Sequence, residues 1–186
     1  MKQWLDSAIE RGAVPVLTGS NGDMDTIGSA IALSSIHPSL LACGLHLGRV
    51  AKRMVEDLQA PFRKIAAKGT AFPEQMGGII IVDAAAPDQV GIDLPDVPRL
   101  ILDHHATNGW EIRDGDLMIQ WDVRATTEMI ATYMLEYAKE ALTEPVRKML
   151  LAGMITDTGR FRHANASSFS ITTKLLEDCL LYTSPS

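Results

Sequence analysis

Four acidic segments of this chain follow apolar stretches and carry side chains that can bind metal ions. They are Asp23-Met24-Asp25, Asp83, Asp103-His104-His105 and Asp157. Taken singly, each has an ordinary explanation, because an aspartate after an apolar run is commonly a turn or helix-capping residue. Taken together, carboxylates that converge at one end of a sheet would repel one another and raise one another's pKa. Divalent cations would cancel this repulsion, so the pattern predicts a metal centre.

The ligand types indicate which ions such a centre would hold. Carboxylate oxygens with one imidazole suit Mn²⁺ or Mg²⁺ better than a zinc site rich in thiolates would. Four aspartates carry a charge that two divalent ions would balance, and paired ions about 3.5–4 Å apart are suited to phosphate chemistry. The two cysteines, Cys43 and Cys179, are too few for a disulfide framework or a structural zinc site.

The segments that precede these residues read as strands of a parallel sheet. The predicted strands span 13–18, 39–45, 78–84, 98–103 and 117–121, and the predicted helices span 25–33, 48–58, 126–142, 144–155 and 168–178. Apolar strands that alternate with helices predict an α/β fold, with a parallel, Rossmann-like sheet and helices on both faces. Ligands of such sheets bind beyond the carboxyl ends of the strands, where the aspartates stand.

The composition is that of a soluble globular protein with one domain. Of the 186 residues, 46% are hydrophobic and 22% are charged. No window approaches the apolar run of about 18 residues that a membrane helix needs. The N-terminus lacks the apolar core of a signal peptide, so we expect a cytoplasmic protein. The net charge of −6 disfavours binding to long nucleic acid but is compatible with a small anionic substrate.

The last eight residues, CLLYTSPS (179–186), resemble the translation of a sequencing adapter, and the helical pattern stops just before them. We interpret residues 1–178 as one catalytic domain and residues 179–186 as a non-native tail. On this interpretation a C-terminal substrate domain is missing. The alternative is an ordinary C-terminal tail.

Four stretches of the sequence together resemble the motifs of the DHH phosphoesterases, in the family's order. They are GDMDTIGS (22–29), IIIVDAA (79–85), DHHATN (103–108) and GMITDTGRFRH (153–163). The stretch at 121–136 is similar to the family's helix before the fourth motif, and the resemblance covers about residues 13–178. It implies a catalytic domain like those of RecJ and the oligoribonucleases.

The resemblance also implies a set of metal ligands. Asp23 and Asp83 would bind the first ion. Asp25, Asp83, His104 and Asp157 would bind the second, with Asp83 bridging the two.

The remaining motif residues would act on the substrate. The resemblance implies that Asp103 orients the histidines and that His105 contacts the scissile phosphate and stabilises its developing charge. Arg160, Arg162 and His163 follow the fourth motif and read either as a cationic clamp on a phosphate or as a solvated turn.

Arg124 and the pair Thr126-Thr127 are weaker candidates for a role at the site. One position departs from the family pattern, because a histidine usually stands four residues before the first aspartate, and here that residue is Gly19. The first ion then lacks an imidazole, which water, a second carboxylate oxygen or the side-chain oxygen of Asn21 would replace.

The function implied by the resemblance is divalent-metal-dependent hydrolysis of a phosphoester bond by metal-activated water. The expected substrate is a small nucleotide or a short oligonucleotide. We expect no membrane partner, and the sequence is compatible with a homodimer. We expect the chain to be inactive by itself, because the family's substrate cleft lies between two domains. Two alternatives remain: a DHH-type inorganic pyrophosphatase, and a non-catalytic homologue that binds a metal or nucleotide because Gly19 replaces the motif histidine.

Overall fold

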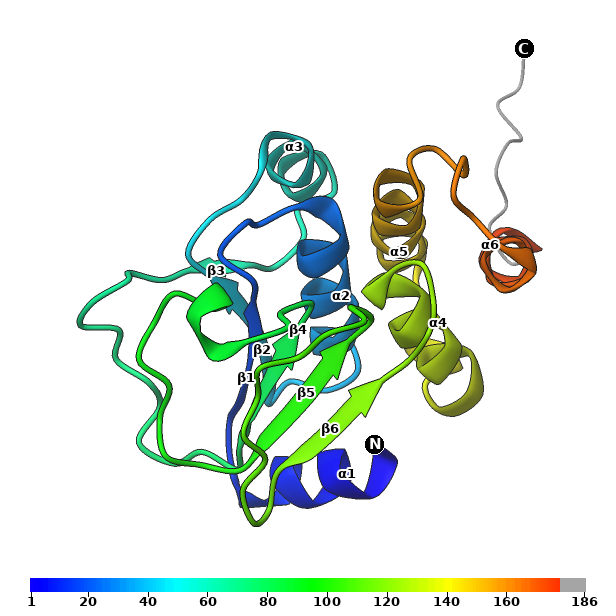
Figure 1. Cartoon of the computed structure of the whole chain (residues 1–186). Helices are drawn as coiled ribbons and strands as arrows, with labels where there is room; N and C mark the ends of the chain where they lie inside the picture. Colours follow the sequence, from blue (N-terminus) through cyan, green and yellow to red (C-terminus); the bar gives the residue numbers. More distant parts are fainter. Residues whose placement is uncertain (178–186) are drawn as a thin grey trace.

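Six parallel strands form one sheet in the order β3-β2-β1-β4-β5-β6 (Figure 1). The computed structural model describes residues 1–177. The strands are β1 (Val14–Thr18), β2 (Leu40–Gly44), β3 (Arg63–Lys64), β4 (Ile79–Val82), β5 (Arg99–Asp103) and β6 (Leu117–Gln120). The predicted parallel α/β fold is therefore confirmed, and only the two-residue β3 was not expected from the sequence.

Six α-helices accompany the sheet. They are α1 (Lys2–Arg11), α2 (Met24–Ser34), α3 (Arg49–Asp57), α4 (Thr126–Tyr137), α5 (Glu144–Asp157) and α6 (Ala166–Glu177) within residues 1–177, with two short 3-10 helices, η1 (Pro87–Gln89) and η2 (Lys139–Ala141). Helix α1 was not predicted, although its buried residues Leu5 and Ala8 stand on one helical face. None of the described helices is long and apolar enough to cross a membrane.

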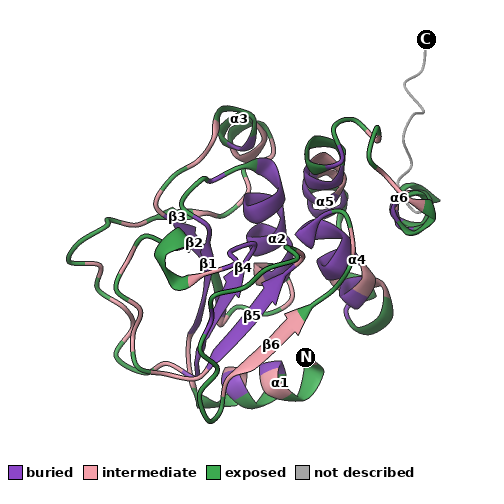
Figure 2. Ribbon diagram, viewed as in Figure 1, coloured by how far each residue is buried: buried purple, intermediate pink, exposed green. Residues whose placement is uncertain are grey.

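The two faces of the sheet are covered differently. On one face, Ile80, Leu100 and Leu102 pack in a core with residues from the α-helices. On the other face, Ile79, Ile81 and Ile101 pack with residues of the long connections, and η1 lies over this face. The expectation of helices on both faces is corrected accordingly, because connecting loops and a short 3-10 helix cover the second face. Figure 2 shows that the central strands are buried and that the edge strand β6 is half-exposed.

An ion pair fixes the start of β5 at the end of the sheet where the strands begin. The Arg99 Nε donates to Asp116 Oδ2 at 2.9 Å, and the Arg99 guanidinium lies over the Trp110 ring, 5.5 Å from its centroid. Burial raises the pKa of the Asp116 carboxyl, but hydrogen bonds from Arg99 and the Arg113 backbone outweigh this and lower it below 3.8. Asp116 is therefore held as a carboxylate.

The interpretation of residues 179–186 as a non-native tail concerns a segment, together with Cys179, that lies outside the described residues.

Candidate metal centre

The four acidic segments meet at the carboxyl ends of the strands. Asp83 directly follows β4, and Asp103 is the last residue of β5, so that His104 and His105 begin the next connection. Asp23 and Asp25 stand at the start of α2, and Asp157 is the last residue of α5. The sequence therefore places these side chains through strand ends and helix ends, because neighbouring parallel strands end at the same edge.

His104 lies at the centre of a cluster with Asp25, Asp83 and Asp157, which we call the inner cluster. Its Nε2 is 3.4 Å from Asp157 Oδ2, 3.6 Å from Asp83 Oδ1 and 3.9 Å from Asp25 Oδ2. All three separations are too long for good hydrogen bonds. The imidazole and the carboxylates therefore surround a common space instead of bonding to one another.

The inner cluster fits a divalent ion. An ion with metal–oxygen distances of about 2.1 Å holds its ligand atoms at separations of roughly 3–4.2 Å. Ligand atoms of Asp25, His104 and Asp157 all lie within 4.8 Å of one another, as do those of Asp83, His104 and His105. Because the donors are oxygens and imidazole nitrogen, their chemistry suits a Mn²⁺-like or Mg²⁺-like cation.

The electrostatics of the inner cluster call for added positive charge. Burial raises the pKa of Asp83 well above 3.8, and the charges of Asp25, Asp23 and Asp157 raise it further. Burial and the charge of Asp157 raise the pKa of Asp25 to about 6, although hydrogen bonds partly offset them. Burial also raises the pKa of Asp157, while His104 opposes this. The carboxylates thus disfavour one another's charged forms, and a cation would relieve that repulsion.

The first turn of α4 holds two of these carboxylates. Asp25 Oδ2 accepts a hydrogen bond from the Thr126 backbone N–H at 2.7 Å, and Asp25 Oδ1 accepts from the N–H and hydroxyl of Thr127 at 2.8 and 2.5 Å. The Thr126 hydroxyl donates to Asp83 Oδ1 at 3.1 Å. The free N–H groups of a helix start attract anions. The threonine pair is therefore more important than its weak sequence signal indicated, and its place at the start of a predicted helix was the clue.

Gly153 brings α5 close to this arrangement. A Cβ at Gly153 would lie 2.5 Å from Thr127 Cγ2 and 3.2 Å from Asp25 Cα. Only glycine leaves room for α5 to pass so near α2 and α4, and the same helix ends four residues later at Asp157.

Asp83 has a left-handed backbone conformation, with φ of 57°. This conformation is unusual for residues other than glycine, asparagine and aspartate, and such residues concentrate at functional sites. The backbone N–H of Asp83 still donates to the Leu102 carbonyl at 2.9 Å, so the chain turns only after the sheet pairing is complete.

Asp103 and His105 form a second pair beside the inner cluster. Asp103 is fully buried, and its Oδ1 lies 2.7 Å from His105 Nδ1. A hydrogen on Nδ1 makes this a hydrogen bond, so His105 Nε2 faces away from Asp103 and Nδ1 is not free to bind a metal. The other oxygen of Asp103 has no hydrogen-bond partner in residues 1–177. The half-exposed His105 ring lies against His104, with centroids 4.7 Å apart.

Asp23 lies on the exposed flank of the inner cluster. Its Oδ1 accepts from the Thr26 N–H at 3.0 Å and caps α2, and its Oδ2 accepts from Asn21 Nδ2 at 2.7 Å. Its charge reaches Asp83 and Asp157, whose pKa values it raises. We call Gly19, Asn21 and Asp23 the outer side. The role of Asp23 as a metal ligand stays a prediction, because no described group of closely spaced ligand atoms includes it.

Arg160, Arg162 and His163 lie in the exposed segment between α5 and α6. Arg160 and Phe161 have left-handed φ values of 60° and 65°. Within the described part of the chain, no hydrogen bond or ion pair joins the side chains of Arg160, Arg162 or His163 to the inner cluster. Their contact with a substrate therefore stays a prediction.

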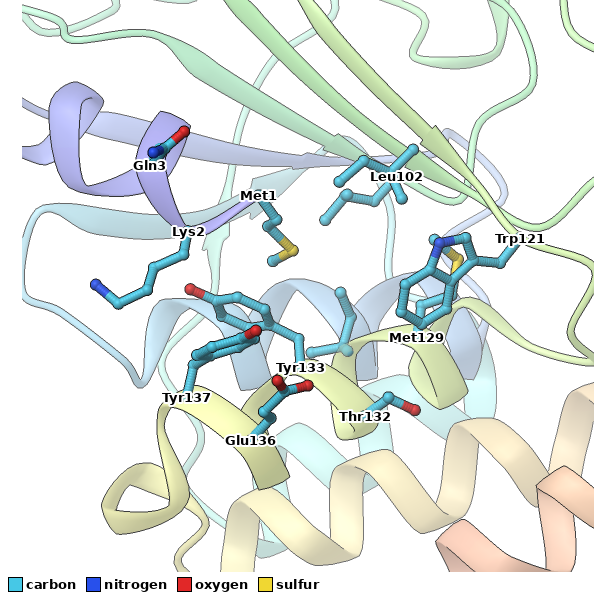
Figure 3. A pocket seen from close by; sticks show the side chains of 12 residues that line it. Met1, Lys2, Gln3, Leu102, Trp121, Met129, Thr132, Tyr133, Glu136 and Tyr137 are labelled. Atoms are coloured by element: carbon cyan, nitrogen blue, oxygen red, sulfur yellow. The ribbon is translucent and has the colours of Figure 1, made fainter.

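Two cavities lie near the strand ends. One, of about 240 Å³, opens beside the centre and is lined by Gly19, Ser20, Asn21, Asp83, Gln89 and His105. The other, of about 470 Å³, lies between the start of α1, β6 and α4, with Trp121, Tyr133 and Tyr137 in its wall (Figure 3). None of the inner-cluster side chains lines the larger cavity, so the chemistry belongs to the smaller one.

Known proteins resemble this chain in both sequence and fold. The DHH family, N-terminal domain, matches residues 13–156. An uncharacterised protein of Methanocaldococcus jannaschii is 26% identical over 91% of this chain and 53% of its own length. The bifunctional oligoribonuclease and PAP phosphatase NrnA of Thermus thermophilus is 27% identical over 84% of this chain and 46% of its own length. The chain thus spans about half the length of these curated relatives.

Two solved structures share the fold. A putative family II inorganic pyrophosphatase of Methanococcus jannaschii superposes with a TM-score of 0.71 and 23% identity, over 88% of this chain and 55% of its own. An exopolyphosphatase-related protein of Bacteroides fragilis gives a TM-score of 0.62 and 16% identity, over 95% of this chain and 54% of its own. The family match spans well over half of the chain and includes Asp23, Asp25, Asp83 and the Asp103-His104-His105 triplet. The chain therefore belongs to the DHH family and carries its N-terminal domain.

Proposed function

We propose that this chain is the metal-binding part of a phosphoesterase that hydrolyses a phosphoester bond in a small nucleotide or a short oligonucleotide. The observation that carries the proposal is the arrangement of Asp25, Asp83 and Asp157 around His104 Nε2, at 3.4 to 3.9 Å and without mutual hydrogen bonds. A cluster built only for stability would pair these buried carboxylates with lysine or arginine side chains.

The inner cluster would hold a Mn²⁺ or Mg²⁺ ion, and Asp23 with Asp83 would hold a second one. Bound ions at such a site supply Lewis acidity and lower the pKa of water, so that a nucleophile is available at neutral pH. The chain's own residues supply position, because α4 fixes Asp25 through three hydrogen bonds and Asp83 through one. This fixed geometry lowers the cost of organising the site around a phosphate.

Asp103 and His105 would act on the substrate phosphate. Buried Asp103 fixes the orientation of the His105 ring through Nδ1. The half-exposed ring would use Nε2 to contact a phosphate oxygen, where negative charge grows during cleavage. Arg160, Arg162 and His163 would add positive charge from the segment after α5.

The substrate class is supported by the relatives. The Thermus thermophilus relative is named for action on oligoribonucleotides and on PAP, which are small nucleotide phosphoesters. A small site also agrees with the net charge of −6, which disfavours long nucleic acid. Pyrophosphate hydrolysis and metal-dependent regulation remain the competing functions, and the same assay separates all three.

The test measures Mn²⁺-dependent release of nucleotide or phosphate from a dinucleotide RNA, from PAP and from pyrophosphate. It uses this chain and a form extended at its C-terminus to the length of the curated relatives, of which this chain spans about half. We expect turnover of the nucleotide substrates by the extended form, with Asp103→Ala and Asp157→Ala each lowering the rate by about a hundredfold or more. Asp93→Ala is the matched control, because Asp93 is exposed and lies outside the cluster.

The outcomes assign the function. Turnover of pyrophosphate alone would favour the pyrophosphatase. Tight Mn²⁺ binding without turnover of any substrate would favour a regulatory protein. If both aspartate variants kept the rate of the Asp93→Ala control, the assignment of the catalytic site would be wrong.

A further inference from the structure

The side chain of Asn21 stands where the motif histidine would begin. A Cβ at Gly19 would lie 3.1 Å from Asn21 Oδ1 and 3.0 Å from the Asp83 carbonyl oxygen. Both contacts are tighter than ordinary packing allows. The space that a side chain at position 19 would enter is therefore occupied by the amide oxygen of Asn21.

The orientation of this amide is set by its neighbour. Asn21 Nδ2 donates to Asp23 Oδ2 at 2.7 Å. A carboxylate accepts hydrogen bonds but cannot donate them, so the NH₂ end of the amide must face Asp23 and the oxygen end must face Gly19. Within residues 1–177 no hydrogen bond to Asn21 Oδ1 is formed, and this oxygen keeps its lone pairs available.

Asn21 lines a polar cavity beside the metal centre. Asn21 lines the cavity of about 240 Å³ together with Gly19, Asp83 and His105. Asp23 is joined to Asn21 by the hydrogen bond and acts electrostatically on Asp83 and Asp157. Asn21 and Asp83 therefore border the same cavity, and Asp23 is linked to it through its hydrogen bond with Asn21.

We propose that Asn21 Oδ1 is the ligand that replaces the missing imidazole at the first metal, beside Asp23 and Asp83. This inference rests on the proposed function, because it assumes a centre with two ions. An amide oxygen is a harder donor than an imidazole nitrogen, so the exchange shifts this site towards Mg²⁺ and Mn²⁺ and away from Zn²⁺ and Co²⁺. Hydrolysis at this centre should therefore depend on hard cations, which prefer oxygen ligands.

The first experiment counts and titrates bound Mn²⁺ in the 186-residue chain by electron paramagnetic resonance, which detects the free ion directly. Wild type is expected to bind two ions of unequal affinity. Asn21→Ala should weaken the weaker site by about tenfold or more and leave the tighter site unchanged. Ser20→Ala is the matched control, since it removes a hydroxyl from the same cavity without touching the amide.

The second experiment restores the imidazole. Gly19→His alone should not strengthen the weaker site, because its Cβ would meet Asn21 Oδ1. The double variant Gly19→His/Asn21→Ala removes the contact with the amide and leaves the 3.0 Å contact with the Asp83 carbonyl oxygen, which a small backbone shift relieves. It should regain at least wild-type affinity, with a preference shifted towards Co²⁺ and Zn²⁺. Thermal unfolding of every variant in chelator checks that the fold is retained.

The outcomes separate this inference from the proposed function. Two unchanged Mn²⁺ sites in Asn21→Ala would overturn the inference alone, as would an equal loss in Ser20→Ala. Additive effects of the two substitutions in the double variant would also overturn it. A wild-type chain that binds no Mn²⁺ at all would instead overturn the metal centre and the proposed function with it.

Discussion

The inner cluster and the outer side of the centre are built in different ways. Asp25 is 1% exposed and accepts three hydrogen bonds from the first turn of α4, about a hundred residues away in sequence. Asp23 is exposed, and its side-chain hydrogen bonds come from Asn21 and Thr26, two and three residues away. Contacts between distant parts of the chain thus hold the side chains of the inner cluster in place, while local contacts within one loop and the first turn of α2 hold those of the outer side. A ligand can be exchanged on the outer side without rebuilding the sheet.

The largest expected effect comes from Asp83, because the proposed function assigns it to both metal sites, the one in the inner cluster and the one on the outer side. Asp83→Asn keeps the shape and tolerates the left-handed backbone, but it removes the charge. We expect Mn²⁺ affinity at both sites to fall by about a hundredfold or more. Because burial and neighbouring carboxylates disfavour the Asp83 charge, the metal-free variant should be more stable than wild type. Mn²⁺ titration and thermal unfolding in chelator measure both effects.

Retention of two tight Mn²⁺ sites in Asp83→Asn would show that the two metal sites do not share this residue. A metal-free variant with a lower melting temperature would contradict the electrostatic argument.

The hydrogen bonds from α4 can be weakened without altering a ligand. Thr127→Val removes the hydroxyl that donates to Asp25 at 2.5 Å but keeps the backbone N–H. We expect the tighter Mn²⁺ site to weaken by about tenfold, with the weaker site unchanged. Thr132→Val is the control, because among residues 1–177 the Thr132 hydroxyl donates only to the Glu128 carbonyl of the same helix. Equal losses in both variants would mean that helix stability, and not the contact with Asp25, is being measured.

A substitution at the end of the sheet opposite the metal centre should change the free energy of unfolding and leave Mn²⁺ affinity unchanged. Asp116 has a lowered pKa, so its ion pair with Arg99 stabilises the protein above the ordinary pKa of 3.8, and this contribution is lost as pH falls through the folded value. Asp116→Asn should lower the free energy of unfolding at neutral pH by about 1–3 kcal/mol. Urea unfolding across pH should show this difference shrinking in acid, with Mn²⁺ binding unaffected at neutral pH.

Asp93→Asn is the matched control for this experiment. A difference between Asp116→Asn and wild type that persists unchanged well below pH 3.8 would contradict the assignment of the stabilisation to the carboxylate.

The smallest expected effect concerns the segment after α5, which lies outside both the inner cluster and the outer side. Arg160→Ala should raise the KM of a nucleotide substrate by about two- to fivefold, since an exposed charge contributes roughly 0.5–1 kcal/mol. Mn²⁺ affinity should stay constant, and Arg53→Ala, an exposed arginine on α3, is the control. An altered Mn²⁺ affinity with unchanged KM would assign Arg160 to the metal centre instead of the substrate.

Periodicity predicted the strands and the convergence of their aspartates well, because a strand buried on both faces reads as a continuous apolar run. The run Ile79–Val82 followed by Asp83 is the clearest case. Helix α1 was missed because its few apolar residues are divided by charged ones. The covering of the second sheet face by loops also lay beyond the sequence pattern, since irregular segments carry no periodicity.

The grouping of the acidic residues around His104 was predictable from the sequence, and the contacts that support them were not. Motif order predicted Asp25, Asp83, His104 and Asp157, and the structure brings them together. The partnership of Thr127 with Asp25 depends on how α4 docks against α2, a packing geometry that no local pattern encodes. The need for glycine at position 153 was equally hidden, because it depends on the distances between helices.

The hydrogen bonds between Asp25 and α4 also bear on how fast a bound ion would exchange. An ion held by the inner cluster would leave easily only when its ligands separate, and Asp25 would be released from its hydrogen bonds when the first turn of α4 opens. Ion release and deuterium exchange at the Thr126 and Thr127 amides should therefore report the same local opening. A protein built this way would exchange its inner ion slowly, even while the outer ion equilibrates rapidly with the surroundings.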